Sequence, residues 1–201
     1  MSGCVSDSAD DDSQPVSDTS EGQSPLEVRL QEAVDGLLSS RLAPGASVAV
    51  IDGGELTEVV SGMADPTSVT RAGDNRSRRP TSCNGCRSRP TLVTTATEAA
   101  AFAHALFSGD VLGPTTLAEM LDTGAMRGLP CPAECPFEYG LGVFHYELAG
   151  HELVGHDGSS GTIVVRDQRR DLTVAILTNG GEQDIGAFLE TVISAVDETD
   201  G

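Results

Sequence analysis

Cysteines are the first residues of this 201-residue chain whose spacing could do chemistry. Cys83-x-x-Cys86 and Cys131-x-x-x-Cys135 form two close pairs. Four thiolates at such short spacings can hold a tetrahedral zinc ion, and outside the cell the same pairs could close two short disulfides. The first pair lies in a segment of anomalous composition and the second spacing is loose. We therefore treat a zinc site as a weak possibility and expect no cofactor.

Histidines form the second such group. His145, His151 and His156 follow one another at short intervals and could together bind a metal. No carboxylate spacing supports that site. Strand alternation also leaves it open which of the three histidines share a face. His156 is also followed by Asp157 and Gly158. An imidazole at a strand end can donate to a carboxylate, and a glycine there lets a ligand approach the backbone.

The charge of the chain excludes several kinds of partner. It has 31 acidic and 12 basic residues and a net charge of −19, and every basic residue is arginine. Nucleic acids and anionic membrane surfaces repel such a chain. The lack of lysine excludes a Schiff base or a lysine general base within this chain. No apolar run approaches the roughly 20 residues of a membrane span, so we expect none.

The N-terminal residues have the composition of a disordered tether. Residues 5–24 are rich in Ser and Asp and contain no basic residue. The start Ser2-Gly3-Cys4 resembles the mature end of a membrane lipoprotein, in which the cysteine carries lipid. A lipid anchor at Cys4 and a place in the cell envelope, outside the cytoplasm, would follow if an upstream signal precedes this chain. The alternative is a disordered tail with a chance cysteine.

The elements that must position these residues follow from hydrophobic periodicity and from capping and turn residues. The order predicts an α+β fold, an antiparallel sheet with the N- and C-terminal helices packed on one face. Helices are predicted over 24–42, 95–107, 114–121 and 185–196, and strands over 47–52, 56–61, 139–146, 152–156, 162–165 and 172–177.

One segment interrupts this pattern. Residues 71–90 hold six of the twelve arginines, a single acid and two cysteines, and they show no periodicity. They could be a basic loop that binds an acidic ligand or the acidic tail, or they could be non-native sequence, and we favour the second interpretation. The expected organisation is a disordered acidic tether (1–24), one domain (25–66 and 91–197) and an anomalous basic linker (67–90).

Several stretches resemble the serine β-lactamase-like proteins, a family that contains class C β-lactamases, D-alanyl-D-alanine carboxypeptidases and related esterases. The resemblance covers about residues 26–66 and 91–196, and its C-terminal part is the more specific. It is carried by Ala43-Pro-Gly-Ala-Ser-Val-Ala-Val-Ile-Asp-Gly53, Ser61-Gly-Met-Ala-Asp-Pro66, Leu92-Val-Thr-Thr-Ala-Thr-Glu98, Phe102-Ala-His-Ala-Leu-Phe-Ser-Gly109, Tyr139-Gly-Leu-Gly-Val143, Gly155-His-Asp-Gly-Ser-Ser-Gly161 and Asp171-Leu-Thr-Val-Ala-Ile-Leu-Thr-Asn179.

The resemblance implies three catalytic elements, and one of them is visible. The family uses Ser-x-x-Lys, Tyr-x-Asn, and a Lys/His-x-Gly element on an edge strand that faces the substrate carboxylate. His156-Asp157-Gly158 matches the third. Ser68-Val-Thr-Arg71 places arginine where the base should be, and a guanidinium of pKa above about 12 cannot accept a proton. Ser68 is therefore only a doubtful remnant, and no Tyr-x-Asn occurs.

The expected function is that of a degenerate or internally truncated member of this family, inactive as given. The parent reaction implied by the resemblance is hydrolysis of a β-lactam, a D-Ala peptide or an ester through an acyl-serine intermediate. One alternative is a non-enzymatic cell-envelope module that binds a small molecule or peptide near His156. A less favoured alternative is a small zinc-stapled domain.

Overall fold

The computed structural model describes residues 22–40, 43–63, 94–126, 138–158, 161–179 and 184–199. The predicted helices and strands lie within a few residues of the observed ones, with one exception explained below. In chain order the elements are α1 (Pro25–Ser39), β1 (Gly45–Asp52), β2 (Glu55–Gly62), α2 (Ala96–Ser108), α3 (Pro114–Leu121), the short 3-10 helix η1 (Thr123–Met126), β3 (Glu138–Tyr139), β4 (Phe144–Leu148), β5 (His151–Gly158), β6 (Thr162–Asp167), β7 (Leu172–Thr178) and α4 (Ile185–Asp197).

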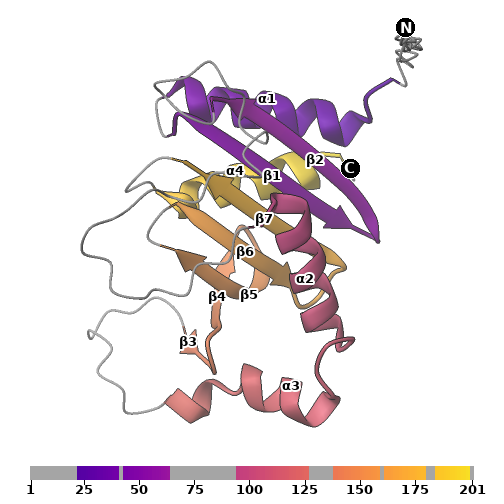
Figure 1. The fold of residues 1–201 in the computed structure, drawn as a ribbon, viewed down its shortest axis with the longest axis vertical. Helices are drawn as coiled ribbons and strands as arrows, with labels where there is room; N and C mark the ends of the chain where they lie inside the picture. The colour runs from indigo at the N-terminus through magenta and orange to yellow at the C-terminus, as the bar shows by residue number, and fades with distance from the viewer. Residues whose placement is uncertain are drawn as a thin grey trace, which may run out of the picture.

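The seven strands form a single antiparallel sheet in the order β2-β1-β7-β6-β5-β4-β3. Strand β1 pairs with β7, so the first and last strands of the chain lie side by side as the second and third strands from one edge of the sheet. Figure 1 shows α2 on one face of the sheet and α4, with α1 beside it, on the other. The predicted α+β fold is confirmed, with the two terminal helices packed together on one face.

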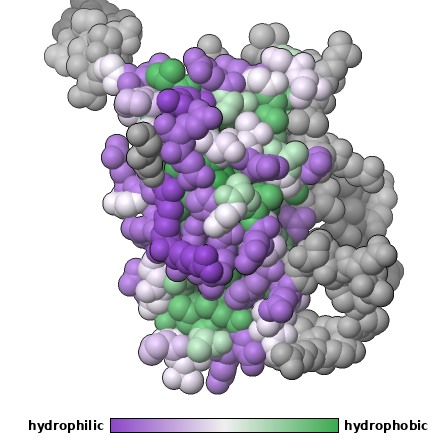
Figure 2. Space-filling view, turned by 180° about the vertical axis from the view of Figure 1, so that it is seen from behind, coloured by the Kyte–Doolittle hydropathy of each residue, from purple (hydrophilic) through white to green (hydrophobic). Residues whose placement is uncertain are grey.

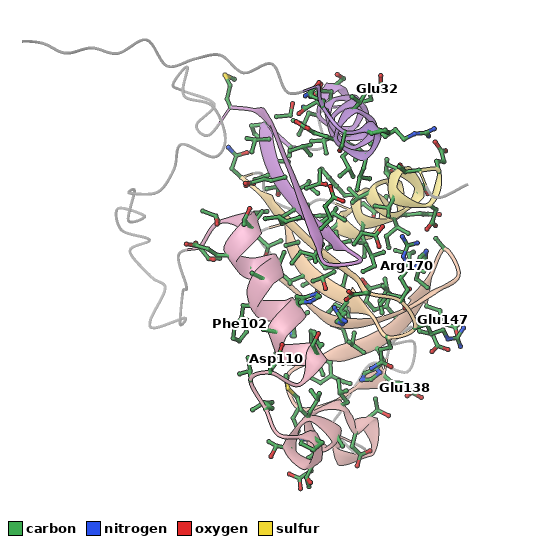
Figure 3. All side chains as sticks on the ribbon, turned by 90° about the vertical axis from the view of Figure 1, so that its right-hand side faces the viewer. Glu32, Phe102, Asp110, Glu138, Glu147 and Arg170 are labelled. Atoms are coloured by element: carbon green, nitrogen blue, oxygen red, sulfur yellow. The ribbon has the colours of Figure 1, made fainter. Side chains whose placement is uncertain are left out.

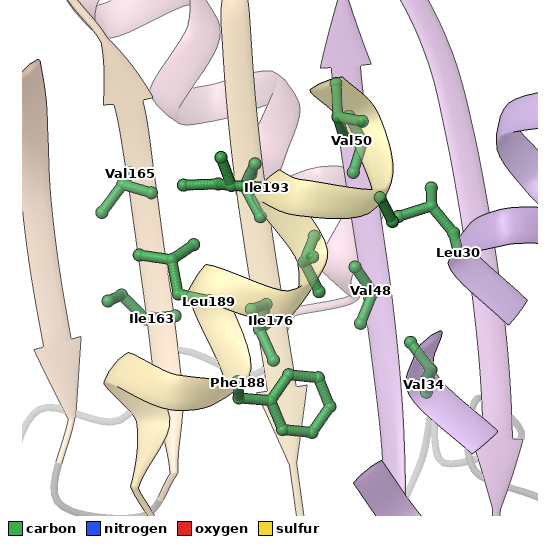
Figure 4. Packing of buried hydrophobic residues seen from close by; sticks show 14 of the residues in the cluster. Leu30, Val34, Val48, Val50, Ile163, Val165, Ile176, Phe188, Leu189 and Ile193 are labelled. Atoms are coloured by element: carbon green, nitrogen blue, oxygen red, sulfur yellow. The ribbon is translucent and has the colours of Figure 1, made fainter. Parts of the chain in front are cut away.

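The main core lies between the terminal helices and the sheet. Helix α4 buries one apolar stripe completely, and Leu30 and Val34 of α1 meet it with no exposed surface (Figure 4). Burying each such side chain contributes about 1.5–3 kcal/mol, so this face supplies much of the stability. The fully buried residues of α4 are Phe188, Leu189, Val192, Ile193 and Val196.

Helix α2 covers the opposite face with small side chains. Ala96, Ala100 and Ala103 are buried, and the first two pack over Ala49 and Ala175 of the sheet. The predicted capping box starts the helix, with Thr95 and Glu98 bonding to each other's backbone N–H groups. Alanines let the helix approach closely, whereas Phe102 points away from the sheet and is 59% exposed (Figure 3).

The prediction of one strand over residues 139–146 is wrong. The chain forms a hairpin there, with Tyr139 of β3 opposite Phe144 of β4. Gly140 donates its N–H to the Val143 carbonyl at 2.7 Å, and Gly142 adopts φ +81°, a left-handed conformation that glycine enters freely. The two glycines therefore turn the chain back on itself, which places Tyr139 beside β4 rather than in line with it.

The surface is largely polar, as the high content of acidic residues leads one to expect. Figure 2 shows a face that is hydrophilic over most of its area, with a smaller apolar patch towards its lower end. No helix in the described ranges combines the length and apolar character that crossing a membrane requires.

Candidate functional site

The element His156-Asp157-Gly158 forms the last three residues of β5. Pairing with β6 continues to Gly158, whereas pairing with β4 ends where Gly155 lies opposite Phe144. Strand β5 is thus an inner strand and not the edge strand that the resemblance implied. Its last three residues nevertheless extend past β4, and within the described residues no strand pairs with that side of their backbone.

His156 is exposed at this strand end, and both nitrogens of its ring have partners. Nε2 lies 2.6 Å from the Tyr139 hydroxyl, and Nδ1 lies 2.5 Å from the carbonyl oxygen of Asp157. The Tyr139 ring meets the imidazole edge-on at a centroid distance of 5.7 Å, and the Phe144 ring lies 5.4 Å away. Three aromatic side chains from β3, β4 and β5 therefore form one cluster.

These partners fix the tautomer of a neutral His156. A carbonyl oxygen only accepts, so Nδ1 must carry the hydrogen and donate it to Asp157. Nε2 then has a lone pair and accepts from the Tyr139 hydroxyl. The phenol is the donor in this pair as long as the imidazole is neutral.

The loop after Tyr139 is held by close backbone contact with α3. A Cβ on Gly140 would lie 2.4 Å from the carbonyl oxygen of Met120, which no real side chain tolerates. The same carbonyl accepts the N–H of Leu141 at 2.9 Å. Glycine at position 140 thus lets the hairpin rest on the end of α3, which holds Tyr139 in place beside His156.

Gly155 plays the corresponding part on β5. A Cβ there would lie 2.0 Å from the Val164 carbonyl oxygen and 2.8 Å from the Cα of Val165. Only glycine permits this approach of β5 to β6. Phe144, its register partner on β4, therefore lies opposite a residue without a side chain.

Asp157 is exposed and lies near Tyr146 of β4. Burial raises the pKa of the Tyr146 phenol, and the negative charge of Asp157 raises it further. The Tyr146 hydroxyl oxygen is buried and has no hydrogen-bond partner in the described part of the chain. Tyr146 therefore stays protonated, and its hydroxyl is no part of the hydrogen-bonded pair of Tyr139 and His156.

A second polar cluster holds α4 against the sheet. His151 bonds Asp167 at 2.6 Å through Nδ1 and Asp197 at 3.0 Å through Nε2. Arg170 donates to Asp197 at 2.9 Å and to Asp52 at 2.8 Å. Figure 3 places Arg170 beside the end of α4, where these partners converge. Nothing in the sequence pattern pointed to this cluster.

The other histidines have structural contacts. Arg166 donates to Nδ1 of His104 at 2.8 Å. Burial lowers the pKa of His145, although the Glu138 charge and a hydrogen bond to the Leu121 backbone act in the other direction. The three histidines considered as metal ligands thus have separate surroundings, and no three His, Cys, Asp or Glu side chains of the described residues could together hold a metal ion.

Several predicted site residues lie outside the described residues. They are Ser68, the four paired cysteines Cys83, Cys86, Cys131 and Cys135, and the proposed lipid-carrying Cys4. Predictions about a nucleophile remnant, a zinc site, disulfides and a lipid anchor therefore remain predictions.

Comparison with known families identifies the chain. A sequence model of the Beta-lactamase family matches residues 62–194, about two thirds of its length. The chain belongs to the beta-lactamase family. No curated protein matches this beta-lactamase family member significantly.

Solved structures share the fold of this beta-lactamase family member at low sequence identity. The D-amino acid amidase from Ochrobactrum anthropi SV3, complexed with L-phenylalanine amide, matches with a TM-score of 0.66 and 14% identity, covering 89% of this chain and 100% of that chain. SurE with D-Leu matches with a TM-score of 0.58 and 12% identity, covering 88% and 76%. The penicillin binding protein from Bacillus halodurans matches with a TM-score of 0.38 and 20% identity over 53% and 31%, which is too low to indicate a shared fold.

Sequence reasoning singled out His156 as a candidate and did not identify its hydrogen-bond partner Tyr139. Tyr139 belongs to the Tyr-Gly-Leu-Gly stretch that carried the resemblance, but it lacks the asparagine of a Tyr-x-Asn element. The signal that could have found it is the pair Gly140 and Gly142, which marks a turn directly after the tyrosine. A turn there lets the chain run back as β4, which pairs Tyr139 with Phe144 and leaves the Tyr139 side chain within reach of His156 on β5.

Proposed function

We propose that this chain is a non-hydrolysing member of the beta-lactamase family that binds a small molecule or peptide carrying a carboxylate at the end of β5. The observation that carries this proposal is the backbone of His156–Gly158, which is extended and paired on one side only among the described residues, with His156 and Asp157 exposed.

An open strand side is suited to an extended peptide. A peptide can add itself to an unpaired strand and gain main-chain hydrogen bonds, while neighbouring side chains supply specificity. Gly158 has no side chain to obstruct that approach, and His156, two residues before it on β5, bonds the Tyr139 hydroxyl. These features support binding of a peptide that ends in a carboxylate.

The absence of hydrolysis is proposed from the sequence. Acyl transfer by this family needs a serine activated by a lysine three residues on, and this chain contains no lysine. Arg71 follows Ser68 at that spacing but stays protonated. Neither tyrosine is followed by the asparagine of the second family element. Binding without turnover fits these residues best.

Binding is tested with N-acetyl-D-Ala-D-Ala and with the same peptide amidated at its C-terminus. Two fold relatives with TM-scores above 0.5 are a D-amino acid amidase and SurE, the latter solved with D-Leu, which makes D-amino acid peptides reasonable first probes. We expect saturable binding by calorimetry, weakened about tenfold by His156→Ala, because this variant removes the side chain that bonds and packs against Tyr139 beside the strand end. Glu147→Ala, an exposed change on the neighbouring β4, should bind like the unmodified chain.

Turnover is tested separately with nitrocefin and a p-nitrophenyl ester. We expect no hydrolysis above that of Ser68→Ala. Hydrolysis that depends on Ser68 would overturn the proposed inactivity. Absence of saturable binding to both peptides would overturn the proposed binding.

The setting in the cell envelope is a further part of the proposal. A lipid on Cys4 would tether the domain through the acidic residues 5–24. The intact mass of the protein from its own cells tests this: lipid on Cys4 supports the anchor. A mass well above 20.8 kDa, with lysine-containing peptides, would instead indicate an active hydrolase of which this chain is a broken reading.

A further inference from the structure

The hydrogen bonds of His156 raise a difficulty for direct binding of a carboxylate by its imidazole. Nδ1 donates to the Asp157 carbonyl at 2.5 Å, and Nε2 is bonded to the Tyr139 hydroxyl at 2.6 Å. Both ring nitrogens are thus engaged, and neither is left to donate to a ligand. The polar atom of this cluster with spare capacity is the Tyr139 oxygen, since a hydroxyl has one donor and two acceptor positions.

We propose that the Tyr139 hydroxyl, and not the His156 imidazole, donates to the ligand carboxylate, and that it becomes free to do so when His156 takes up a proton. This inference rests on the proposed function, because it names the contact by which that ligand is held. Tyr139 is thereby a ligand-binding residue, and His156 positions and switches it.

The proton count follows from the geometry. With a neutral imidazole the Tyr139 hydrogen points to Nε2, so an approaching carboxylate meets only lone pairs. A proton from solvent on Nε2 reverses this hydrogen bond, and Nε2–H then donates to the Tyr139 oxygen. The phenol hydrogen is released and can donate to the carboxylate. One proton is taken up from solvent for each carboxylate bound, and no covalent bond is made or broken.

The surroundings leave few other groups to control this switch. The ionisable groups placed around the imidazole are the Tyr139 phenol on β3 and the Asp157 carboxylate, which follows it on β5. Strand β4 contributes the Phe144 ring and β6 has Val164 as the register partner, and neither carries charge. The Glu138 carboxylate on β3 accepts from the Thr123 hydroxyl at 3.0 Å. Histidine is the residue type in this cluster that can take up a proton near neutral pH.

Two tyrosine variants separate this mechanism from direct binding by histidine. Tyr139→Phe removes the hydroxyl and keeps the ring that packs on His156. We expect it to bind N-acetyl-D-Ala-D-Ala at least tenfold more weakly at pH 5.5, the cost of one charged hydrogen bond. Tyr146→Phe is the matched control because its hydroxyl has no partner in the described part of the chain, and it should bind normally. If the imidazole bound the carboxylate directly, Tyr139→Phe would free Nε2 and bind as well or more tightly, which would overturn the inference.

The pH dependence of peptide affinity provides a second test. Affinity for the free-acid peptide should fall as pH rises from 5 to 8, and affinity for its C-terminal amide should stay constant. His156→Gln should bind with little pH dependence. A pH-independent affinity of the unmodified chain for the free acid would overturn the inference while leaving the proposed function in place.

A measurement without ligand completes the test. Nitrogen chemical shifts of His156 at pH 8 should show the hydrogen on Nδ1, and the Nε2–H tautomer would overturn the proton switch. If the hydrogen is found on Nδ1 and the unmodified chain still binds neither peptide, the proposed function fails. The carboxylate contact of Tyr139 then fails with it.

Discussion

His151 of β5 and Asp197 of α4 are joined by a hydrogen bond of 3.0 Å between Nε2 and Oδ2. The other ring nitrogen bonds Asp167 at 2.6 Å, and the His151 side chain is only 11% exposed. Burial lowers the pKa of His151, but hydrogen bonds to the two aspartates and their charges outweigh burial, so the pKa is raised. Because carboxylates only accept, both bonds are complete when the imidazole is charged. In its charged form His151 thus holds the last helix to the sheet through both hydrogen bonds.

This raised pKa predicts that the contribution of His151 to stability falls as pH rises. A group whose pKa is higher in the folded chain binds its proton more tightly there, so it stabilises fully below the ordinary value of 6.5. That contribution is lost as pH rises through the folded value. We expect His151→Gln to lower the free energy of unfolding by about 1–2 kcal/mol at pH 5.5, and by less at pH 8.5.

Urea unfolding at the two pH values measures this difference. His156→Gln is the control, since His156 is exposed on the same strand and has no carboxylate bonded to its ring nitrogens. A His151→Gln penalty that is equal at pH 5.5 and 8.5 would contradict the charged state of the buried histidine.

Arg170 and His151 are expected to act together, because each bonds a different oxygen of Asp197. Arg170→Ala should cost about 1–2 kcal/mol, since it also leaves Asp52 without this donor. The double variant with His151→Gln should depart from additivity by about 0.5–1 kcal/mol at pH 5.5. The exposed pair of Arg29 and Glu198 is the comparison, and Arg29→Ala should cost less than about 0.5 kcal/mol. Additive losses at the shared aspartate would contradict the coupling.

Gly155 is predicted to tolerate no side chain. A Cβ would overlap the Val164 carbonyl oxygen at 2.0 Å, so β5 and β6 would have to separate next to His156. We expect Gly155→Ala to lower the free energy of unfolding by about 2–4 kcal/mol. Gly36→Ala in α1 is the opposite case, because the added Cβ would have no atom within 4 Å apart from its chain neighbours and the nearby backbone of the helix itself. It should stabilise by about 0.5–1 kcal/mol. Thermal unfolding of both variants tests the contrast.

The fold was largely predictable because its signals are local. The apolar stripe of α4, the Thr95 capping box and the turn at Gly53-Gly54 each depend on residues within a few positions of one another. The one strand error, over 139–146, came from treating two glycines as strand residues. Their freedom to adopt turn conformations decides the path of the chain there, and apolar alternation does not report it.

The candidate site was predictable only in part because its contacts are not local. His156 was proposed through resemblance and stays a prediction, and its pairing with Tyr139 depends on a hairpin that the sequence pattern did not predict. The cluster of His151, Asp167 and Asp197 joins three elements, and no spacing in the sequence encodes it. Polar contacts of this kind depend on the pairing register of the strands and on how the helix packs on them. The pattern of apolar and polar residues within one segment does not specify either.

Tyr146 provides the last prediction, since its hydroxyl is buried without a hydrogen-bond partner among the described residues. Burial and the Asp157 charge raise the pKa of its phenol, so the buried group is a neutral hydroxyl at ordinary pH. An unpaired buried hydroxyl loses its water contacts on folding and gains nothing in exchange. The ring itself packs on Phe144 at a centroid distance of 5.0 Å and would be kept by phenylalanine. We therefore expect Tyr146→Phe to raise the free energy of unfolding by about 1 kcal/mol in urea titrations at pH 7. A loss of stability would show that the hydroxyl does have a partner.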